Sequence, residues 1–515
     1  MISALALERS SPWRTAGVMA CFLPVVMFAA PMLWRAAMRP AASPISVSFS
    51  DAVATSMAAA TLVGVIAFIV GLPAGVLAGL YRLPGGSILL PLIALAALVP
   101  SFLWAIGWSS LSQRLGPIAI DAVNSLGGVV LALLSGAAPL VFITSFVATR
   151  GLTASQVEAV RLGGGERAVM LHACRHTAPP AALGAALAAV LTLGDPGPGT
   201  ILGRRTAAAD ILTTFSAQYD FGLAARQSLV LAAVALAVMV PVVATAGPRL
   251  ADAVLARQLR PAPRSASRRA GLAGGAIICF VVLVTAGLPL AGLLWPLLGG
   301  VEARRALDAL ARTGGSTLIY SVGAGALAAV LGLACGVLTG RSTRGRIIVL
   351  AGSILVLVVP PTMISLGLVE IGSAAPPAAD ALLRSRLTVC LALAARLFPI
   401  AAVLGMRAFG GMAPSWAQAA AVHGVPLSRY MLRVVGPWLA PPGIAAGMLV
   451  ALLAAADVGT ALLLHPPGYP SLPLTIFTVM ANAPESLVAS LCMVYVITAT
   501  LLLGVTTACL RRQAR

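Results

Sequence analysis

Long apolar runs alternate with short polar segments along the whole chain. Each run approaches or exceeds the roughly 20 residues that a helix needs to cross a bilayer. Twelve such runs lie near 16–34, 54–80, 87–109, 126–148, 179–201, 227–246, 271–295, 315–340, 347–369, 387–406, 440–464 and 488–510. The pattern predicts an all-α integral membrane protein with about 12 transmembrane helices.

Prolines interrupt two of these runs near their middles. Pro100 lies inside the third run, and Pro360 and Pro361 lie inside the ninth. A proline within a helix removes one backbone hydrogen bond and crowds the preceding turn. We therefore expect both spans to be bent or broken.

Short sequences in the first half of the chain recur about 260 positions later. GLPAGVLAG at 71–79 matches GLACGVLTG at 332–340, and PSFLWAIG at 100–107 matches PPTMISLG at 360–367. Each copy contains six runs. Because six is even, both copies cross the membrane in the same direction. The sequence thus predicts two parallel six-helix repeats.

The repeat also divides the chain into domains. We expect a first transmembrane half at 1–246, an arginine-rich cytoplasmic linker at 247–270 and a second transmembrane half at 271–515. The first run could be mistaken for a secretory signal. Its Leu33-Trp34 pair recurs at Leu294-Trp295, so we expect this helix to be retained.

Composition agrees with a membrane location. The chain is 59% hydrophobic and 10% charged, with a mean hydropathy of +0.99, whereas soluble domains carry roughly 25% charged residues. The net charge of +19 could indicate nucleic-acid binding. The charges stand at the ends of apolar runs, however, which favours contact with anionic membrane lipid over nucleic acid.

All 34 basic residues are arginines. Without lysine the chain cannot form a P-loop, a Schiff base or a kinase site. We therefore expect no enzyme of these classes and no bound cofactor. If ATP is used, a separate chain must hydrolyse it.

Arginine also predicts the orientation. With a cytoplasmic N-terminus, the inner segments hold 22 arginines against 4 acids, and the outer segments hold 11 against 10. The positive-inside rule then places both termini in the cytoplasm.

Two inner loops have similar charged, glycine-containing sequences. VEAVRLGGGER (157–167) and AQAAAVHGVPLSR (417–429) each follow the fourth helix of their half. Each pattern predicts a short helix, a turn at Gly164 or Gly424 in the left-handed conformation, and a second helix. A short helix on a cytoplasmic surface is suited to a partner's groove, and two such helices indicate a partner present twice.

The EAA pattern followed by a glycine and then prolines resembles the cytoplasmic loop of binding-protein-dependent ABC importer permeases. The resemblance covers both halves and implies a permease with its two transmembrane domains fused, in a bacterial cytoplasmic (inner) membrane. It implies two cytoplasmic ABC ATPase subunits and an external, periplasmic substrate-binding protein as partners. The implied ATPase-docking residues are Glu158, Ala159, Gly164, Gln418, Ala419, Ala420 and Gly424.

The loops depart from the family pattern at two positions. Gln418 replaces the usual glutamate, and Val160 replaces the second alanine. Glutamine keeps the shape of glutamate but lacks its charge, which implies weaker docking at the second loop.

The segment DVGTALLLHPPGYPSLPLTIFTVM (457–480) is similar to the corresponding part of fused ferric-iron-type permeases. The resemblance implies transport of iron(III); related branches carry thiamine, phosphonates, sulfate or polyamines. Asp457 occupies the position of the usual acid, and Asp195 is its counterpart in the first half. Each could line the path or simply end a helix.

Arg396 lies within an apolar run, where an arginine costs roughly 2.5–3.5 kcal/mol. It could line a water-filled path, or it could pair with a buried acid such as Asp457. His172 and His176 have the spacing of metal ligands on one helix face, but no acid or third histidine accompanies them, and we expect no metal site.

A secondary transporter of the major facilitator type is the main alternative. It would also have twelve spans, and GRSTRGR (340–346) is faintly similar to a loop of that family. Such a transporter has no need of two matched helical loops, and it would usually carry more membrane-embedded charge. A membrane enzyme would need a convergent catalytic set, which the four scattered histidines do not provide.

Overall fold

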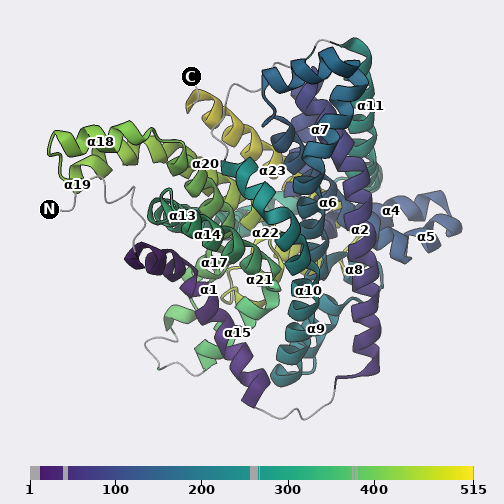
Figure 1. The fold of residues 1–515 in the computed structure, drawn as a ribbon. Helices are drawn as coiled ribbons and strands as arrows, with labels where there is room; N and C mark the ends of the chain where they lie inside the picture. The colour runs from purple at the N-terminus through teal and green to yellow at the C-terminus, as the bar shows by residue number, and fades with distance from the viewer. Residues whose placement is uncertain are drawn as a thin grey trace. The chain divides into compact units, whose positions relative to one another are not determined.

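The fold of the chain comes from a computed structural model (Figure 1). The structure describes residues 12–38, 45–255, 265, 267–373, 376 and 381–513. The structure is 86% helical, and no strand forms among these residues. The all-α prediction is confirmed to this extent. Residues 256–264 and 266 of the predicted linker lie outside the described part.

The helices of the first 300 residues are α1 (Pro12–Met38), α2 (Val47–Leu80), α3 (Gly86–Leu98), α4 (Ser101–Leu115), α5 (Pro117–Val123), α6 (Leu126–Thr149), α7 (Ala154–Leu193), α8 (Gly197–Ile201), α9 (Ala207–Ser216), α10 (Phe221–Leu255), α11 (Arg268–Val282), η2 (Leu283–Gly287), α12 (Leu288–Leu294) and η3 (Trp295–Gly299). The later helices are α13 (Ala303–Thr339), α14 (Thr343–Val358), α15 (Pro361–Ser373), α17 (Arg386–Gly410), α18 (Pro414–Val422), α19 (Leu427–Tyr430), η4 (Met431–Val435), α20 (Gly436–Ala455), α21 (Gly459–Leu464), α22 (Leu472–Val479) and α23 (Glu485–Gln513).

Each of the twelve predicted runs corresponds to an observed helix or to a bent helix pair. Ten helices within the described residues are long and apolar enough to cross a membrane, and counting each bent pair as one span gives twelve. The protein is therefore a multi-pass membrane protein. The fifth and eleventh predicted runs, 179–201 and 440–464, are rich in glycine and proline, and their helices end before the predicted positions. The helix α7 ends at Leu193, and α20 ends at Ala455.

The two proline-containing spans are broken, as predicted. The axes of α3 and α4 meet at 100°, and those of α14 and α15 at 82°. Val99 and Val359, each directly before a proline, have extended backbones with ψ of 130° and 124°. A residue before proline avoids the helical region because the proline ring crowds it, which explains why both breaks fall at the same repeated position.

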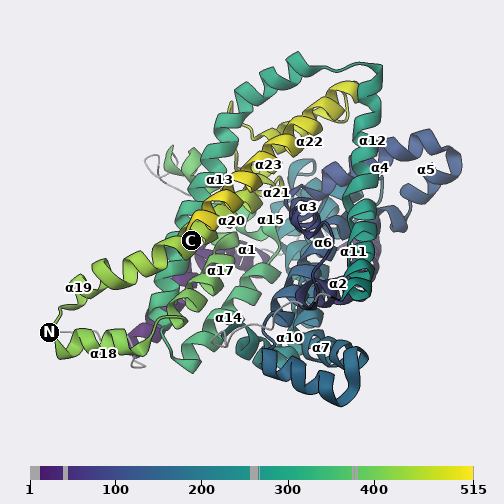
Figure 2. The ribbon, with the colours of Figure 1, turned by 90° about the horizontal axis from the view of Figure 1, so that it is seen from above.

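Contacts divide the chain into two compact units. The helices of each unit can be found by their labels in Figures 1 and 2. Unit 1 comprises Met1–Arg39, Asp308–Thr475 and Thr498–Arg515, and unit 2 comprises Pro40–Leu307 and Ile476–Ile497. The helix α1 therefore belongs to a unit built mainly from the second half of the chain. Conversely, α11 and α12 belong with the first half.

In unit 1, α1 packs on α14, α15 and α17. A Cβ atom on Gly367 of α15 would lie 1.7 Å from the carbonyl oxygen of Phe28, so only glycine allows this approach. The rings of Phe22 and Phe398 meet edge to face at 4.9 Å. At the other end of α1, the buried Arg14 donates a hydrogen bond of 2.6 Å to the carbonyl oxygen of Val337.

In unit 2, α12 packs on α4 in a similar way. A Cβ atom on Gly107 would lie 2.3 Å from the carbonyl oxygen of Pro289, and one on Gly292 would lie 2.0 Å from that of Gly107. The contact between these two helices is therefore made backbone against backbone.

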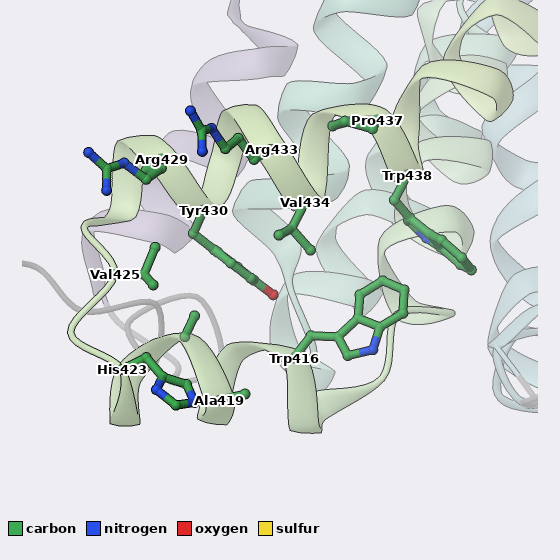
Figure 3. Close-up of a pocket in the computed structure, with 11 residues that line it drawn as sticks. Trp416, Ala419, His423, Val425, Arg429, Tyr430, Arg433, Val434, Pro437 and Trp438 are labelled. Carbon is green, nitrogen blue, oxygen red and sulfur yellow. The ribbon is translucent and has the colours of Figure 1, made fainter.

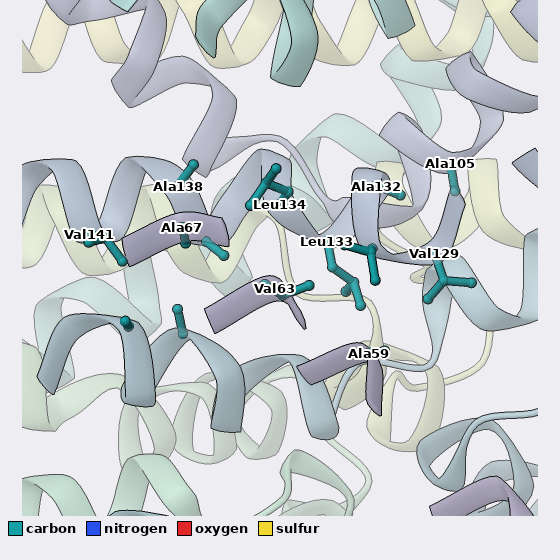
Figure 4. Packing of buried hydrophobic residues seen from close by; sticks show 14 of the residues in the cluster. Ala59, Val63, Ala67, Ala105, Val129, Ala132, Leu133, Leu134, Ala138 and Val141 are labelled. Carbon is teal, nitrogen blue, oxygen red and sulfur yellow. The ribbon is translucent and has the colours of Figure 1, made fainter. Parts of the chain in front are cut away.

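The main core of unit 2 lies where α2, α6 and α7 meet (Figure 4). Its members are mostly small or β-branched, including Val63, Ala67, Ala132, Val141 and Ala181, which are at most 1% exposed. Small side chains let helices approach closely, which is how packing stabilises helix bundles where lipid removes the hydrophobic driving force. A second, smaller core lies under the first charged loop, where Val157 and Val169 pack against Leu80 and Tyr81 at the end of α2.

Candidate functional site

The first charged loop is a helical hairpin inside α7. Thr153 caps its start, with the Gln156 backbone N–H donating to Thr153 Oγ1 at 3.4 Å and the Thr153 N–H donating to Gln156 Oε1 at 3.0 Å. The first arm ends at Gly165, which has φ 66° and ψ −164°. The second arm continues into the membrane span. The predicted helix–turn–helix is confirmed, and its first arm begins with a capping box.

The second charged loop is a hairpin of α18 and α19. Gly424, with φ 64°, makes the turn between them. The second arm continues without interruption through the π turn η4 into α20. The left-handed conformation predicted for Gly424 is confirmed. In the first hairpin the prediction of Gly164 is wrong by one residue, because three successive glycines (163–165) could each make the turn and Gly165 does so.

The predicted docking residues are exposed, with one exception. Glu158, Ala159 and Gly164 in the first hairpin, and Gln418, Ala419 and Gly424 in the second, are all exposed. Ala420 is 9% exposed and packs against the second arm of its own hairpin. A helix face that holds two arms together must be covered, and Ala420 lies on that face.

Sequence reasoning missed one pair of exposed residues. Leu162 is 91% exposed and Val422 is 83% exposed, and each stands near the tip of its hairpin, 260 positions apart. The residues five positions before them, Val157 and Ala417, are buried at 6% and 1% exposure. Each hairpin therefore closes over one small core and presents an apolar side chain outward near its tip. The signal was an apolar residue on the polar face of both charged loops.

The first hairpin is fixed to the end of α2. The Tyr81 hydroxyl donates a hydrogen bond of 2.7 Å to Glu166 Oε2, and Arg161 Nε donates one of 2.9 Å to Glu166 Oε1. Burial raises the pKa of Tyr81, and the hydrogen bond and negative charge of Glu166 raise it further. The tyrosine thus stays protonated and remains a hydrogen-bond donor at physiological pH.

The second hairpin is fixed by donors to backbone carbonyls. Arg341 Nη2 donates to the carbonyl oxygen of Met412, and Trp438 Nε1 donates to that of Ala408 at 3.0 Å. The rings of Trp416 and Trp438 also meet edge to face, at 5.2 Å. Both hairpins are therefore ordered elements attached to the helix bundles.

Arg396 forms an ion pair with Asp457 inside unit 1. Arg396 Nη1 donates to Asp457 Oδ2, and the two side chains are 23% and 7% exposed. Asp457 follows the end of α20, and its Oδ1 accepts a hydrogen bond of 2.7 Å from the Thr460 N–H. The sequence left two roles open for Arg396, lining a path or pairing with a buried acid, and the structure contains the pair with a buried acid. The pair joins the middle of α17 to the turn between α20 and α21.

Asp195 holds the equivalent turn in unit 2. Its Oδ1 accepts a hydrogen bond of 3.0 Å from the Gly197 N–H, and its Oδ2 accepts one of 2.5 Å from the Ser101 hydroxyl. Ser101 is the first residue of α4, directly after the break at Pro100. Asp195 therefore connects the end of the fifth span to the break in the third.

No group of three or more His, Cys, Asp or Glu residues that could hold a metal ion occurs among the described residues. His172 and His176 both lie on the second arm of the first hairpin.

Within the described part of the chain, ten long apolar helices and two bent helix pairs define a multi-pass membrane protein of a transporter-like class. The chain matches no known family, no curated protein and no solved structure. Its function must therefore be argued from its own residues.

Proposed function

We propose that this protein is the fused permease subunit of an ABC importer. The single observation that carries the proposal is the matched pair of hairpins. Each follows the fourth span of its half, turns at a left-handed glycine, and exposes an apolar side chain, Leu162 or Val422, near its tip. An exposed apolar residue on a rigid helix is a typical anchor for a partner's groove. Two matched anchors suit a partner that is present twice.

The order of the helices supports a duplicated chain with two equivalent halves. The broken span, the hairpin and the last helix recur about 260 residues apart, at α3–α4 and α14–α15, at α7 and α18–α20, and at α10 and α23. Gly107 and Gly367, also 260 positions apart, both receive a close-packed helix. The helices that they receive, α12 and α1, each begin the opposite half of the sequence. Two equivalent halves would give this arrangement if the first helix of each half packed on the third span of the other half.

The hairpins are built to transmit motion. The second arm of the first hairpin runs from Glu166 to Leu193, and that of the second runs from Leu427 to Ala455, in each case as one continuous helical stretch. At about 1.5 Å per residue, each arm is roughly 40 Å long and extends from the hairpin into the predicted bilayer. A displacement at the hairpin therefore tilts a whole membrane helix. Closure of two ATPase subunits would in this way move the two halves between inward-open and outward-open states.

The remaining assignments rest on the same proposal. Both termini would lie in the cytoplasm of a bacterial cell, with the protein in its cytoplasmic membrane, and a binding protein would deliver iron(III) or a related small solute to the outer face. ATP would be hydrolysed by the partner. Arg396, Asp457 and Asp195 would lie near the path, because each joins a turn at the end of a span to another membrane helix.

The alternative, a secondary transporter of the major facilitator type, shares the number of spans. It gives no reason for two ordered hairpins with matched apolar tips. It would also transport its solute without any second subunit, which makes the two proposals separable by experiment.

The proposal predicts that ATP hydrolysis accompanies the chain and depends on the hairpin tips. We expect full-length protein, purified from its native membrane in mild detergent, to retain ATPase activity. Leu162→Asp or Val422→Asp should each lower that activity roughly thirtyfold, because loss of an interface anchor costs about 2 kcal/mol or more. ATP hydrolysis per mole of purified chain is the measurement.

The matched control is Ile118→Asp, since Ile118 is 87% exposed on α5, which precedes α6, whereas the first hairpin follows that helix. This variant should keep the ATPase activity of the unsubstituted protein. Solute uptake by the chain alone in proteoliposomes, driven by a proton gradient, would contradict the proposal.

A further inference from the structure

The second hairpin encloses a groove between its two arms. The groove has a volume of about 790 Å³ and lies between α18 and the arm formed by α19, η4 and the start of α20 (Figure 3). Tyr430 and Val434 point into it from the second arm, and Trp416 and Trp438 close one end. Its interior is therefore largely apolar and aromatic.

Two arginines stand at the rim of this groove. Arg429 and Arg433 are one turn apart on the second arm, and Figure 3 shows both guanidinium groups directed outward. Both are exposed, and neither forms an ion pair or hydrogen bond with the described part of the chain. The groove thus combines an apolar interior with two positive charges that have no partner within the described residues.

The groove lies where the chain is expected to enter the membrane. Its second arm is part of the apolar span Leu427–Ala455. Trp438 lies five residues after Arg433, or about 7 Å along the helix axis. Tryptophan prefers the boundary of the hydrocarbon core, and the headgroup layer is roughly 5–7 Å thick on each side. With Trp438 at that boundary, Arg433 is at the depth of lipid phosphates.

An exposed aromatic residue continues the groove towards the surface of the span. Trp438 lines the groove and is 42% exposed, and Ile444, further along the same helix, is 49% exposed. A soluble protein segment could cover the cytoplasmic end of this surface but not the part within the bilayer. A lipid acyl chain could cover both.

The first hairpin lacks these features. At the offset of 260 residues, the position of Trp416 is taken by Gln156, and the positions of Arg429 and Arg433 are taken by Val169 and Ala173. The π turn η4 also adds one residue to the second arm compared with a regular helix, and such turns often occur at binding sites. The aromatic and basic residues of the groove are therefore not repeated at these positions of the first hairpin.

We propose that this groove binds one anionic phospholipid from the cytoplasmic leaflet. Arg429 and Arg433 hold its phosphate, and an acyl chain lies along Val434, Trp416 and Trp438. Basic residues beside an apolar cleft at the membrane surface are the usual basis for anionic lipid recognition. The inference needs only that the chain spans a membrane with its hairpins on the cytoplasmic side, so it stands apart from the proposal of an ATP-driven importer.

Native mass spectrometry of the full-length protein in detergent tests this site. The purified chain is titrated with phosphatidylglycerol, and separately with phosphatidylcholine carrying the same acyl chains. We expect one tight site for phosphatidylglycerol and much weaker binding of phosphatidylcholine. Arg429→Gln combined with Arg433→Gln should weaken phosphatidylglycerol binding by up to about thirtyfold, given the contribution of each basic residue near an anionic surface.

The control variant combines Arg167→Gln with Arg175→Gln in the first hairpin, which removes the same number of exposed charges and leaves the residues that line the groove unchanged. It should bind phosphatidylglycerol within twofold of the unsubstituted protein. Equal loss in both double variants, or equal binding of the two lipids by the unsubstituted chain, overturns the proposal. Displacement of the tight lipid when a copurified soluble subunit is present assigns the groove to protein instead, and overturns it as well.

Discussion

Gly367→Ala is expected to release α1 from unit 1 and to destabilise the protein severely. The added Cβ atom would lie 1.7 Å from the carbonyl oxygen of Phe28, which belongs to a helix backbone and cannot move aside alone. The helices must then separate, and the contact between Phe22 and Phe398 and the hydrogen bond of Arg14 are lost with them. We expect a cost of about 3 kcal/mol, the upper end of what overpacking usually costs. The thermal unfolding midpoint of the full-length protein in detergent measures it.

A control in the same helix distinguishes crowding from a general effect of alanine. Gly372 lies near the end of α15, and the nearest atom to a Cβ there is 3.9 Å away. Gly372→Ala should leave the unfolding midpoint unchanged or raise it slightly. Equal midpoints for Gly367→Ala and Gly372→Ala would mean that α1 does not pack on α15.

Two native cysteines give a direct readout of the same contact. Cys21 of α1 and Cys335 of α13 are both buried and have neighbouring thiols. With a protease site inserted between 39 and 45, oxidation should keep the two fragments joined in the unsubstituted protein. The cross-link should be lost in Gly367→Ala and kept in Gly372→Ala.

Arg396→Ala is expected to produce the second large effect. It leaves the carboxylate of Asp457, which is 7% exposed, without the cation that it faces. Removing one partner of a buried ion pair costs about 3–5 kcal/mol, and the partial exposure of Arg396 favours the lower value. We expect a marked fall in the unfolding midpoint and loss of solute uptake in reconstituted vesicles.

A double variant separates a structural role from a role in the transport path. Arg396→Met combined with Asp457→Asn removes both charges and keeps the approximate volume, so stability should largely return. If the pair lines the path, uptake stays low in this stable protein. If uptake returns together with stability, the pair only joins α17 to the turn after α20, and its assignment to the path is wrong.

The membrane spans were predictable because each depends on the length and composition of one continuous stretch of sequence. An apolar run of sufficient length can hardly be anything but a membrane helix, and Pro100 and Pro360 mark the breaks by restricting the residues before them. The turn in the first hairpin was less certain, since glycines 163–165 are equivalent in sequence. Packing of the two arms, which the sequence does not display, places it at Gly165.

Contacts between distant residues could not be predicted in this way. Nothing in the apolar run of α1 says that it packs against α15, some 340 residues later, and nothing links Tyr81 to Glu166. Charge gave partial guidance, since an arginine within an apolar run requires an acid nearby and Asp457 was one candidate. The exposed residues Leu162 and Val422 were overlooked because an apolar residue in a short polar loop is normally expected to be buried between the arms of that loop.

The exchanged first helix has a consequence for how the protein is made. Translation proceeds at about 5–20 residues per second, so α1 leaves the ribosome roughly 15 to 65 s before α15, the helix that carries its glycine contact. Until α13 is made, α1 has only lipid or the insertion machinery beside it. In the early half, by contrast, α12 follows the helix α4 on which it packs much sooner. Chains that stop before residue 303 would thus hold a first helix without its partners, a mark by which membrane proteases would recognise an unfinished product.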